Sequence, residues 1–160
     1  MVDTFLAALM LVLLQTSDWQ MYTSVVDHFQ LKYPPTMQVH ASIISDYEKV
    51  FAFESGGSRL LTLRVVDLKK YLPKTNTPNL EEYLSTFERL PRYKAARIAG
   101  KPAHEYVLCG SAACDQDVVF LNDNRMYDFS VDVAGTGPDS VSFEKIPMKI
   151  QAIIRSIQFR

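Results

Sequence analysis

The chain has 160 residues, of which 48% are hydrophobic and 22% charged, which is enough apolar content for one folded domain with a real core. Its 17 basic and 18 acidic residues give a formal net charge of −1, which removes the electrostatic attraction that dominates nucleic-acid binding. We therefore expect no nucleic-acid partner. No internal repeat or low-complexity tract divides the sequence, so residues 18–160 are predicted to form a single domain.

The first segment contains an unbroken apolar run, Phe5–Leu14. This length fits the core of a signal peptide and falls short of the ~20 residues that a membrane-spanning helix needs. Because Asp3 and no Lys or Arg precedes the run, residues 1–17 are either a signal peptide or an apolar N-terminal helix that the mature protein keeps. We expect export to a periplasmic, lumenal or secreted location. No cysteine lies near residue 17, so no lipid anchor through an N-terminal cysteine is expected.

Strands dominate the first half of the predicted domain. The double proline Pro34-Pro35 ends the second strand, because proline cannot continue a central strand. Gly56-Gly57 predicts a hairpin between the third strand and the fourth. The predicted strands cover residues 21–25, 29–33, 47–53 and 60–66.

A helix is predicted next, ending before Pro91. Thr77 is the expected N-cap, and Pro78 suits the first helical position. Its buried stripe at helical spacing consists of Leu80, Leu84, Phe87 and Leu90.

The remaining chain is predicted as further strands and a C-terminal helix. Residues 127–133 alternate apolar with polar side chains, which is typical of a sheet with one solvated face. The helix is expected mostly after Pro147, with a core-facing stripe of Phe143, Ile146, Ile150, Ile153 and Ile157. The predicted strands cover 94–98, 103–109, 117–121, 127–133 and a short final segment at 157–159. The fold class is therefore predicted to be α/β (α+β), with an antiparallel sheet of about six or more strands sandwiched by helices.

The two cysteines, Cys109 and Cys114, flank four small residues between two predicted strands. A hairpin would place them opposite each other, within disulfide distance. We expect a disulfide, and because disulfides persist mainly outside the reducing cytosol, this agrees with export. Reduced, inert thiols in a cytosolic protein are the alternative.

No catalytic residue, metal site or cofactor is predicted, and the protein is expected not to be an enzyme. His104-Glu105 lacks the second histidine of a zinc-protease motif, and neither G-x-S-x-G nor a phosphate-binding loop occurs. We interpret a concentration of aspartates as solvation of an exposed sheet face, because a calcium site needs about six or more oxygens. These residues are Asp115, Asp117, Asp123, Asp128 and Asp132.

The candidate interaction site is basic. Its residues are Arg89, Arg92, Tyr93, Lys94 and Arg97, with no acid among them. A second basic group precedes the same predicted helix and consists of Lys69, Lys70, Tyr71 and Lys74. If both groups lie on one side, they form a patch suited to an acidic protein surface or to anionic lipid headgroups. Ordinary charge at helix ends is the alternative.

Three short motifs resemble those of the PsbP-like superfamily. Tyr22 with 29–34 resembles its opening Y…F-x-x-x-Y-P, 98–106 resembles its I-x-G-x-x-A hairpin, and 153–159 resembles its closing I-x-x-S-F-x-F. The resemblance implies an α/β/α sandwich, shared by extrinsic photosystem II subunits, Ran-binding proteins of the Mog type and uncharacterised exported bacterial proteins. This chain looks like the last kind. In the first two kinds the domain binds partners, and no binding residue of the family is matched here.

The leading functional expectation is a non-enzymatic, extracytoplasmic binding or assembly module with a protein or membrane-surface partner. A small hydrolase is a second possibility, which needs a deep pocket holding a histidine and a carboxylate. A cytosolic or nuclear partner-binding protein of the Mog type is a third, in which Phe5–Leu14 belongs to the mature structure. The mature N-terminus distinguishes the first from the third.

Overall fold

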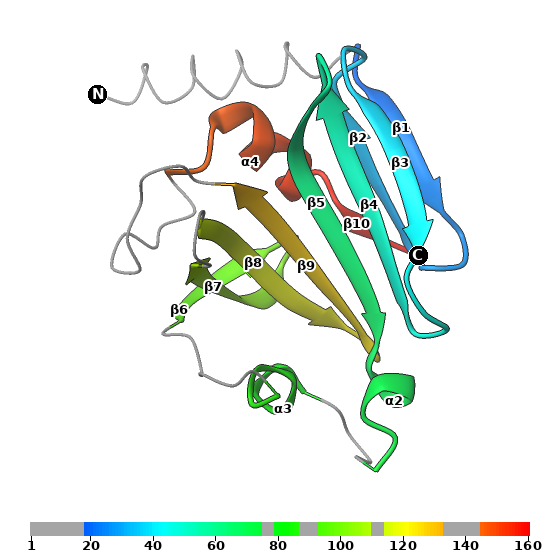
Figure 1. Ribbon diagram of the computed structural model, residues 1–160, viewed down its shortest axis with the longest axis vertical. Coiled ribbons are helices and arrows are strands. Elements are labelled where there is room, and N and C mark those ends of the chain that lie inside the picture. Colours follow the sequence, from blue (N-terminus) through cyan, green and yellow to red (C-terminus); the bar gives the residue numbers. More distant parts are fainter. Residues whose placement is uncertain (1–17, 75–78, 87–92, 110–113, 133–144) are drawn as a thin grey trace.

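The computed structural model describes residues 18–74, 79–86, 93–109, 114–132 and 145–160, which form two antiparallel sheets and three short helices (Figure 1). The large sheet has seven strands in the order β3-β4-β5-β9-β8-β7-β6. They are β3 (Gln38–Ile43), β4 (Glu48–Ser55), β5 (Ser58–Asp67), β6 (Lys94–Ile98), β7 (Lys101–Cys109), β8 (Cys114–Asn122) and β9 (Arg125–Asp132). Gly56 and Gly57 form the two-residue turn between β4 and β5, and both have positive φ, as such a turn requires.

The small sheet has three strands in the order β1-β2-β10 and brings the two ends of the described chain together. Its strands are β1 (Gln20–Ser24), β2 (Phe29–Tyr33) and β10 (Gln158–Phe159). The backbone amide of Lys32 donates to Ser156 Oγ at 2.8 Å, which ties β2 to the segment before β10. In Figure 1 this sheet lies alongside the half of the large sheet formed by β3, β4 and β5.

The main core lies between one face of the large sheet and a layer formed by the small sheet and α4 (Met148–Arg155). Along β9 the side chains of Tyr127, Phe129 and Val131 point into this core, because successive residues of a strand face opposite sides. The Tyr127 hydroxyl donates to the backbone oxygen of Asp27 at 2.7 Å, which satisfies a buried polar group between the two sheets.

A second, smaller apolar cluster covers part of the opposite face. It is formed by α2 (Leu68–Tyr71) and α3 (Leu80–Leu84), and Tyr83 and Leu84 of α3 are part of it. The backbone amide of Glu82 donates to Asn79 Oδ1 at 2.9 Å, so Asn79 caps α3. Figure 1 shows both helices at the same end of the sheet, which leaves the rest of this face without a helical cover in the described chain.

The prediction differs from the structure at a helix cap and at one strand. The cap of α3 is Asn79 and not Thr77, so the N-cap prediction was wrong; Thr77, Pro78, Phe87 and Leu90 lie outside the described residues. Strand β3 was not predicted, although its six residues alternate polar with apolar. It is an edge strand whose side chains are mostly exposed, while Val39 packs partly against the main core.

The antiparallel sheet itself is confirmed, but the fold is more β-rich than a sheet sandwiched by helices. The small sheet occupies much of the layer that the prediction gave to helices. The C-terminal helix begins after Pro147 as predicted and buries Ile150 and Ile153, while Ile146 and Ile157 flank it and Phe143 lies outside the described residues. None of the helices in the described ranges has the length and apolar character needed to cross a bilayer.

Candidate functional site

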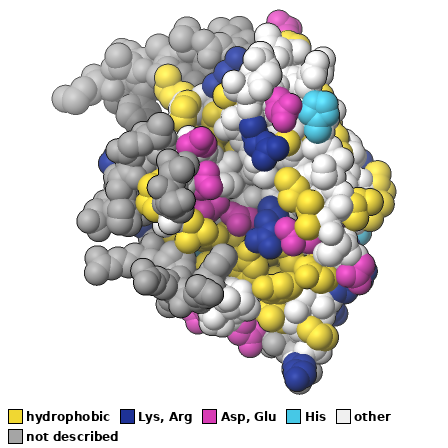
Figure 2. Space-filling model, in the orientation of Figure 1, with side chains coloured by type: hydrophobic (Ala, Val, Ile, Leu, Met, Phe, Trp, Pro, Cys, Tyr) yellow, Lys and Arg dark blue, Asp and Glu magenta, His cyan; other side chains and the backbone are white. Residues whose placement is uncertain are grey.

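A cleft of about 460 Å³ opens on the face of the large sheet that carries α2 and α3. Its lining comes from β4, β5, β7, β8 and β9 and combines apolar with charged side chains. The lining residues are Val50, Arg59, Leu60, Leu61, Thr62, Arg64, Leu108, Asp115, Asp117, Asp128, Ser130 and Asp132. Figure 2 shows acidic side chains gathered with basic ones across the middle of the face, beside a hydrophobic area at the α2 and α3 end.

The polar residues meet there because of the strand register. Asp117 on β8 is paired with Ser130 on β9, and Asp128 on β9 is paired with Arg64 on β5. Since side chains alternate along a strand, the residues of β9 that do not enter the main core point to this face. One consequence is that Asp115 and Asp132 stand directly opposite each other at the outer end of the cleft.

Arg64 is held at the side of the cleft near α3. Its Nε donates to Glu48 Oε1 at 2.6 Å and one terminal nitrogen donates to the Tyr83 hydroxyl at 2.7 Å. Burial opposes the charge of Arg64, but the hydrogen bond to Glu48 and the negative groups around it outweigh burial and raise the pKa of Arg64 above its ordinary value. The guanidinium therefore stays charged, and it is already hydrogen-bonded to the Glu48 carboxylate.

Two aspartates at the floor of the cleft are almost completely buried. Asp117 is 4% exposed and Asp128 is 6% exposed. The Tyr106 hydroxyl donates to Asp128 Oδ2 at 3.4 Å, a long hydrogen bond. Asp117 Oδ2 and Asp128 Oδ1 are buried acceptors with no hydrogen-bond partner among the described residues. Buried acceptors nearly always have a hydrogen-bond partner in folded proteins, so two buried oxygens without one are unusual.

The environment shifts both carboxyl groups toward their neutral form. Burial raises the pKa of Asp117 well above its ordinary value, and the neighbouring charge of Asp128 raises it further, while a hydrogen bond with Ser130 opposes the shift. Burial also raises the pKa of Asp128, to about 6, against the opposing effects of Arg64 and of the Tyr106 hydrogen bond. The two groups thus form a close pair in which one carboxyl disfavours ionisation of the other.

The interpretation of the aspartates as solvation of an exposed face was wrong for Asp117 and Asp128. Tyr106 of the second apolar cluster and Asp128 share a hydrogen bond, and both carboxyl groups keep only a small exposed area at the floor of the cleft. Asp115 and Asp132 are exposed as expected, and Asp123 lies in the β8–β9 turn outside the cleft. Within the described part of the chain, no group of three or more His, Cys, Asp or Glu residues is arranged to hold a metal ion.

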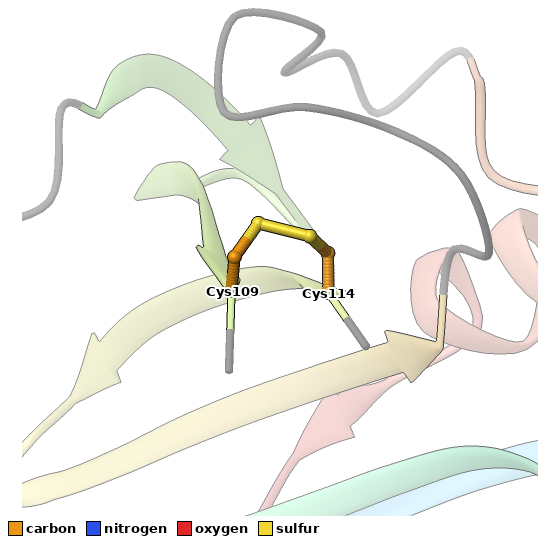
Figure 3. The surroundings of a disulfide bond; sticks show 2 residues. All are labelled: Cys109 and Cys114. Carbon is orange, nitrogen blue, oxygen red and sulfur yellow. A yellow bond between two sulfur atoms is a disulfide. The ribbon is translucent and has the colours of Figure 1, made fainter. Parts of the chain in front are cut away.

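The expected disulfide is present between Cys109 at the end of β7 and Cys114 at the start of β8 (Figure 3). The two residues are cross-strand partners with Cα atoms 4.0 Å apart. The next pair along this hairpin is Leu108 with Asp115, and both line the cleft. The disulfide therefore fixes the strand ends that carry one side of the site.

Removing this bond is expected to lower the free energy of unfolding by about 2 kcal/mol, because closing so short a loop removes little entropy from the unfolded chain. The variant is Cys109→Ser with Cys114→Ser, measured by urea unfolding with and without dithiothreitol. Wild type should fall to the value of the variant when reduced, and the variant should not respond. Equal stability of oxidised and reduced wild type would contradict the expectation.

The basic residues singled out in the sequence lie elsewhere. Tyr93 stacks on His104 with ring centroids 4.2 Å apart, and Lys94 and Arg97 sit on the edge strand β6. Being three residues apart on one strand, Lys94 and Arg97 face opposite sides of the sheet. The second basic group lies on and after α2, which Figure 1 places away from β6, and Arg89 and Arg92 lie outside the described residues. A basic interaction site stays a prediction.

Comparisons with known proteins bear on the fold. No protein-family model matches the sequence, and no curated protein matches it. The solution structure of the cyanobacterial PsbP protein (CyanoP) from Synechocystis sp. PCC 6803 aligns with a TM-score of 0.51 and 16% identity, over 89% of this chain and 92% of that one. The fold is PsbP-like.

The similarity is one of fold, since at 16% identity it concerns the arrangement of strands and helices alone. A crystal structure from Bacteroides thetaiotaomicron also aligns, with 10% identity and a TM-score of 0.45, over 88% of this chain. The chain spans 48% of that protein's length. The cleft aspartates were not identified as a site from the sequence, where the only signal was their density in the second half of the chain.

Proposed function

We propose that this PsbP-like domain is an exported, non-enzymatic binding module that takes its ligand in the cleft on the β5–β9–β8 face. The observation that carries the proposal is the pair of buried, unpartnered carboxylate oxygens on Asp117 and Asp128 at the floor of an open cleft. Unsatisfied buried acceptors cost folding free energy, so their retention favours a functional role. The cleft volume of about 460 Å³ is in the usual range for small-molecule sites.

Export is supported by two independent features. The apolar run Phe5–Leu14 has the length of a signal-peptide core, and the Cys109–Cys114 disulfide suits an oxidising compartment. Mass spectrometry of the protein recovered from its native cell should find a mature N-terminus close to residue 18 in the extracytoplasmic fraction. A chain that begins at Met1 or Val2 and lies in the cytosol would contradict export.

Binding in the cleft is tested by ligand-detected NMR with a mixture of small amines, carboxylic acids and neutral alcohols. Thr62 lies on β5 in the middle of the cleft lining, so Thr62→Phe fills the cleft with a residue that suits a strand. At least one compound class should bind wild type and lose its signal with Thr62→Phe. Thr23→Phe, at an exposed position of β1 in the small sheet, is the matched control and should bind like wild type. Absence of binding, or binding that survives Thr62→Phe, would refute the proposal.

A hydrolase is the second candidate, because two coupled carboxyl groups with raised pKa values can supply a general acid and a general base. The hydrolase expected from the sequence needs a histidine, and the residues lining the cleft include none within the described chain. Turnover of chromogenic esters or glycosides that Asp117→Asn abolishes would favour this candidate over binding alone.

A further inference from the structure

We propose that the cleft binds a primary ammonium or guanidinium group carried on a short alkyl stem, with Asp117 and Asp128 contacting the cationic head. This inference names the ligand class of the site and so rests on the proposed binding function. It follows from the charge of the lining, the unsatisfied acceptors and the apolar residues beside them.

The charge of the lining is unbalanced. Four aspartates line the cleft, and within the described chain none of them forms an ion pair with a Lys or Arg side chain. Both lining arginines have other carboxylate neighbours, since Arg64 binds Glu48 and Arg59 lies 4.0 Å from Glu54. A lining with this excess of carboxylates attracts a cation and repels an anion.

The outer end of the cleft also favours a cationic ligand. Asp115 and Asp132 are directly opposed on β8 and β9, a placement that destabilises a sheet when both side chains carry the same charge. A cation between or below them relieves this repulsion. The opposed pair at the entrance and the buried pair at the floor therefore define a path of carboxyl groups from solvent to the floor.

The unpartnered oxygens set the chemistry of the head group. When the carboxyl groups are ionised, the form that a bound cation favours, Asp117 Oδ2 and Asp128 Oδ1 accept hydrogen bonds only. The site offers these two oxygens no donor among the described residues. An ammonium group brings three donors and a guanidinium group five, so either one satisfies both oxygens at once. A metal ion suits the site less well, because no cluster of three or more ligating side chains occurs in the described chain.

The apolar residues of the cleft lining suit the alkyl stem of the proposed ligand. Val50, Leu60 and Leu108 line the cleft beside the polar residues. Apolar walls around a few polar groups are the usual composition of a small-molecule site, and methylene groups pack on such walls while the charged end is held by carboxylates. Two sources share this chemistry: a free alkylamine or alkylguanidine, and the Lys or Arg side chain of a protein partner.

The test is isothermal titration calorimetry at neutral pH and low salt with matched probes. The cations are 1,5-diaminopentane, agmatine and N-acetyl-lysine methylamide, and the controls of the same length are glutarate and 1,5-pentanediol. The cations should bind, and Asp117→Asn and Asp128→Asn should each weaken binding by about tenfold or more, the effect of losing a charge-assisted hydrogen bond. Asp123→Asn removes the same charge outside the cleft and should change affinity less than about twofold.

The outcomes distinguish the source of the ligand, its chemical class and the position of the site. Preference for the free amines identifies a small-molecule source, and preference for the lysine derivative identifies a protein side chain; both support the inference. If glutarate or pentanediol binds as well as the cations and Thr62→Phe abolishes it, the ligand class is wrong while the binding function stands. If no probe and no compound class in the NMR mixture binds, both are wrong. Equal affinity losses in Asp128→Asn and Asp123→Asn would overturn the placement of the site.

Discussion

Replacing Phe29 by alanine is expected to lower the free energy of unfolding by about 3–5 kcal/mol, the usual cost of deleting a large buried ring. Phe29 is fully buried at 0% exposure and connects the small sheet to the large one. Its ring lies 5.2 Å from that of Phe51 on β4 and 6.0 Å from that of Tyr127 on β9, measured between centroids. The cavity left by alanine would open between the sheets, where backbone on both sides limits collapse.

Urea unfolding followed by circular dichroism measures this change. A loss of that size is a large share of the 5–15 kcal/mol that folded domains typically have, so Phe29→Ala is expected to be close to unfolding at 37 °C. Val25→Ala is the control, because Val25 is 75% exposed in the turn just before β2 and should cost less than about 0.5 kcal/mol. Equal losses for the two variants would mean that this core does not join the two sheets.

Replacing Asp128 by asparagine is expected to stabilise the protein at neutral and alkaline pH, by on the order of 2–3 kcal/mol. The pKa of Asp128 in the folded protein is about 6, raised from an ordinary 3.8. A carboxyl whose pKa is raised by folding stabilises the fold fully below pH 3.8, and that stability is lost as the pH rises through 6. Asparagine stays neutral and keeps an acceptor for the Tyr106 hydroxyl, so the variant avoids the stability loss that ionisation of Asp128 causes in the wild type.

The measurement is the difference in free energy of unfolding between wild type and Asp128→Asn from pH 4 to pH 8. The difference should be small at pH 4, grow through pH 6 and level off above it, since the neighbouring ionisable groups Arg64, Asp115 and Asp117 are present in both proteins. Asp123→Asn should show no such trend. A constant difference across the range, or destabilisation at pH 8, would contradict burial of an ionisable carboxyl at this position.

This result would connect stability with function. If Asp128→Asn stabilises the protein while weakening amine binding, the wild-type carboxyl costs folding free energy and gains a ligand contact. Such a trade is common where a binding site requires buried polar groups without internal partners. A structural role alone for Asp128 predicts the opposite sign, because an internal partner would then be lost.

Much of the local structure could be predicted from the sequence. The alternation of residues 127–133 predicted β9, and the Gly56-Gly57 turn predicted the β4–β5 hairpin, because both depend on side-chain period and backbone conformation within a few residues. The Cys109–Cys114 disulfide followed for the same reason, since the two cysteines flank a short connection between strands. Strand β3 was missed although its six residues alternate polar with apolar, so the period was present in the sequence and was overlooked.

The sequence by itself determined most of the strands and their turns, the cysteine pairing and the presence of a polar face along β9. Only the tertiary structure decided that part of this face is buried, because burial of Asp117 and Asp128 depends on how distant strands pair and on what packs over them. Arg64, Tyr106 and Asp128 come from three separate strands and meet through the order β5-β9-β8-β7, while Tyr83 reaches Arg64 from α3. Alternation along one strand tells which side chains share a face, and it carries no information about whether water reaches that face.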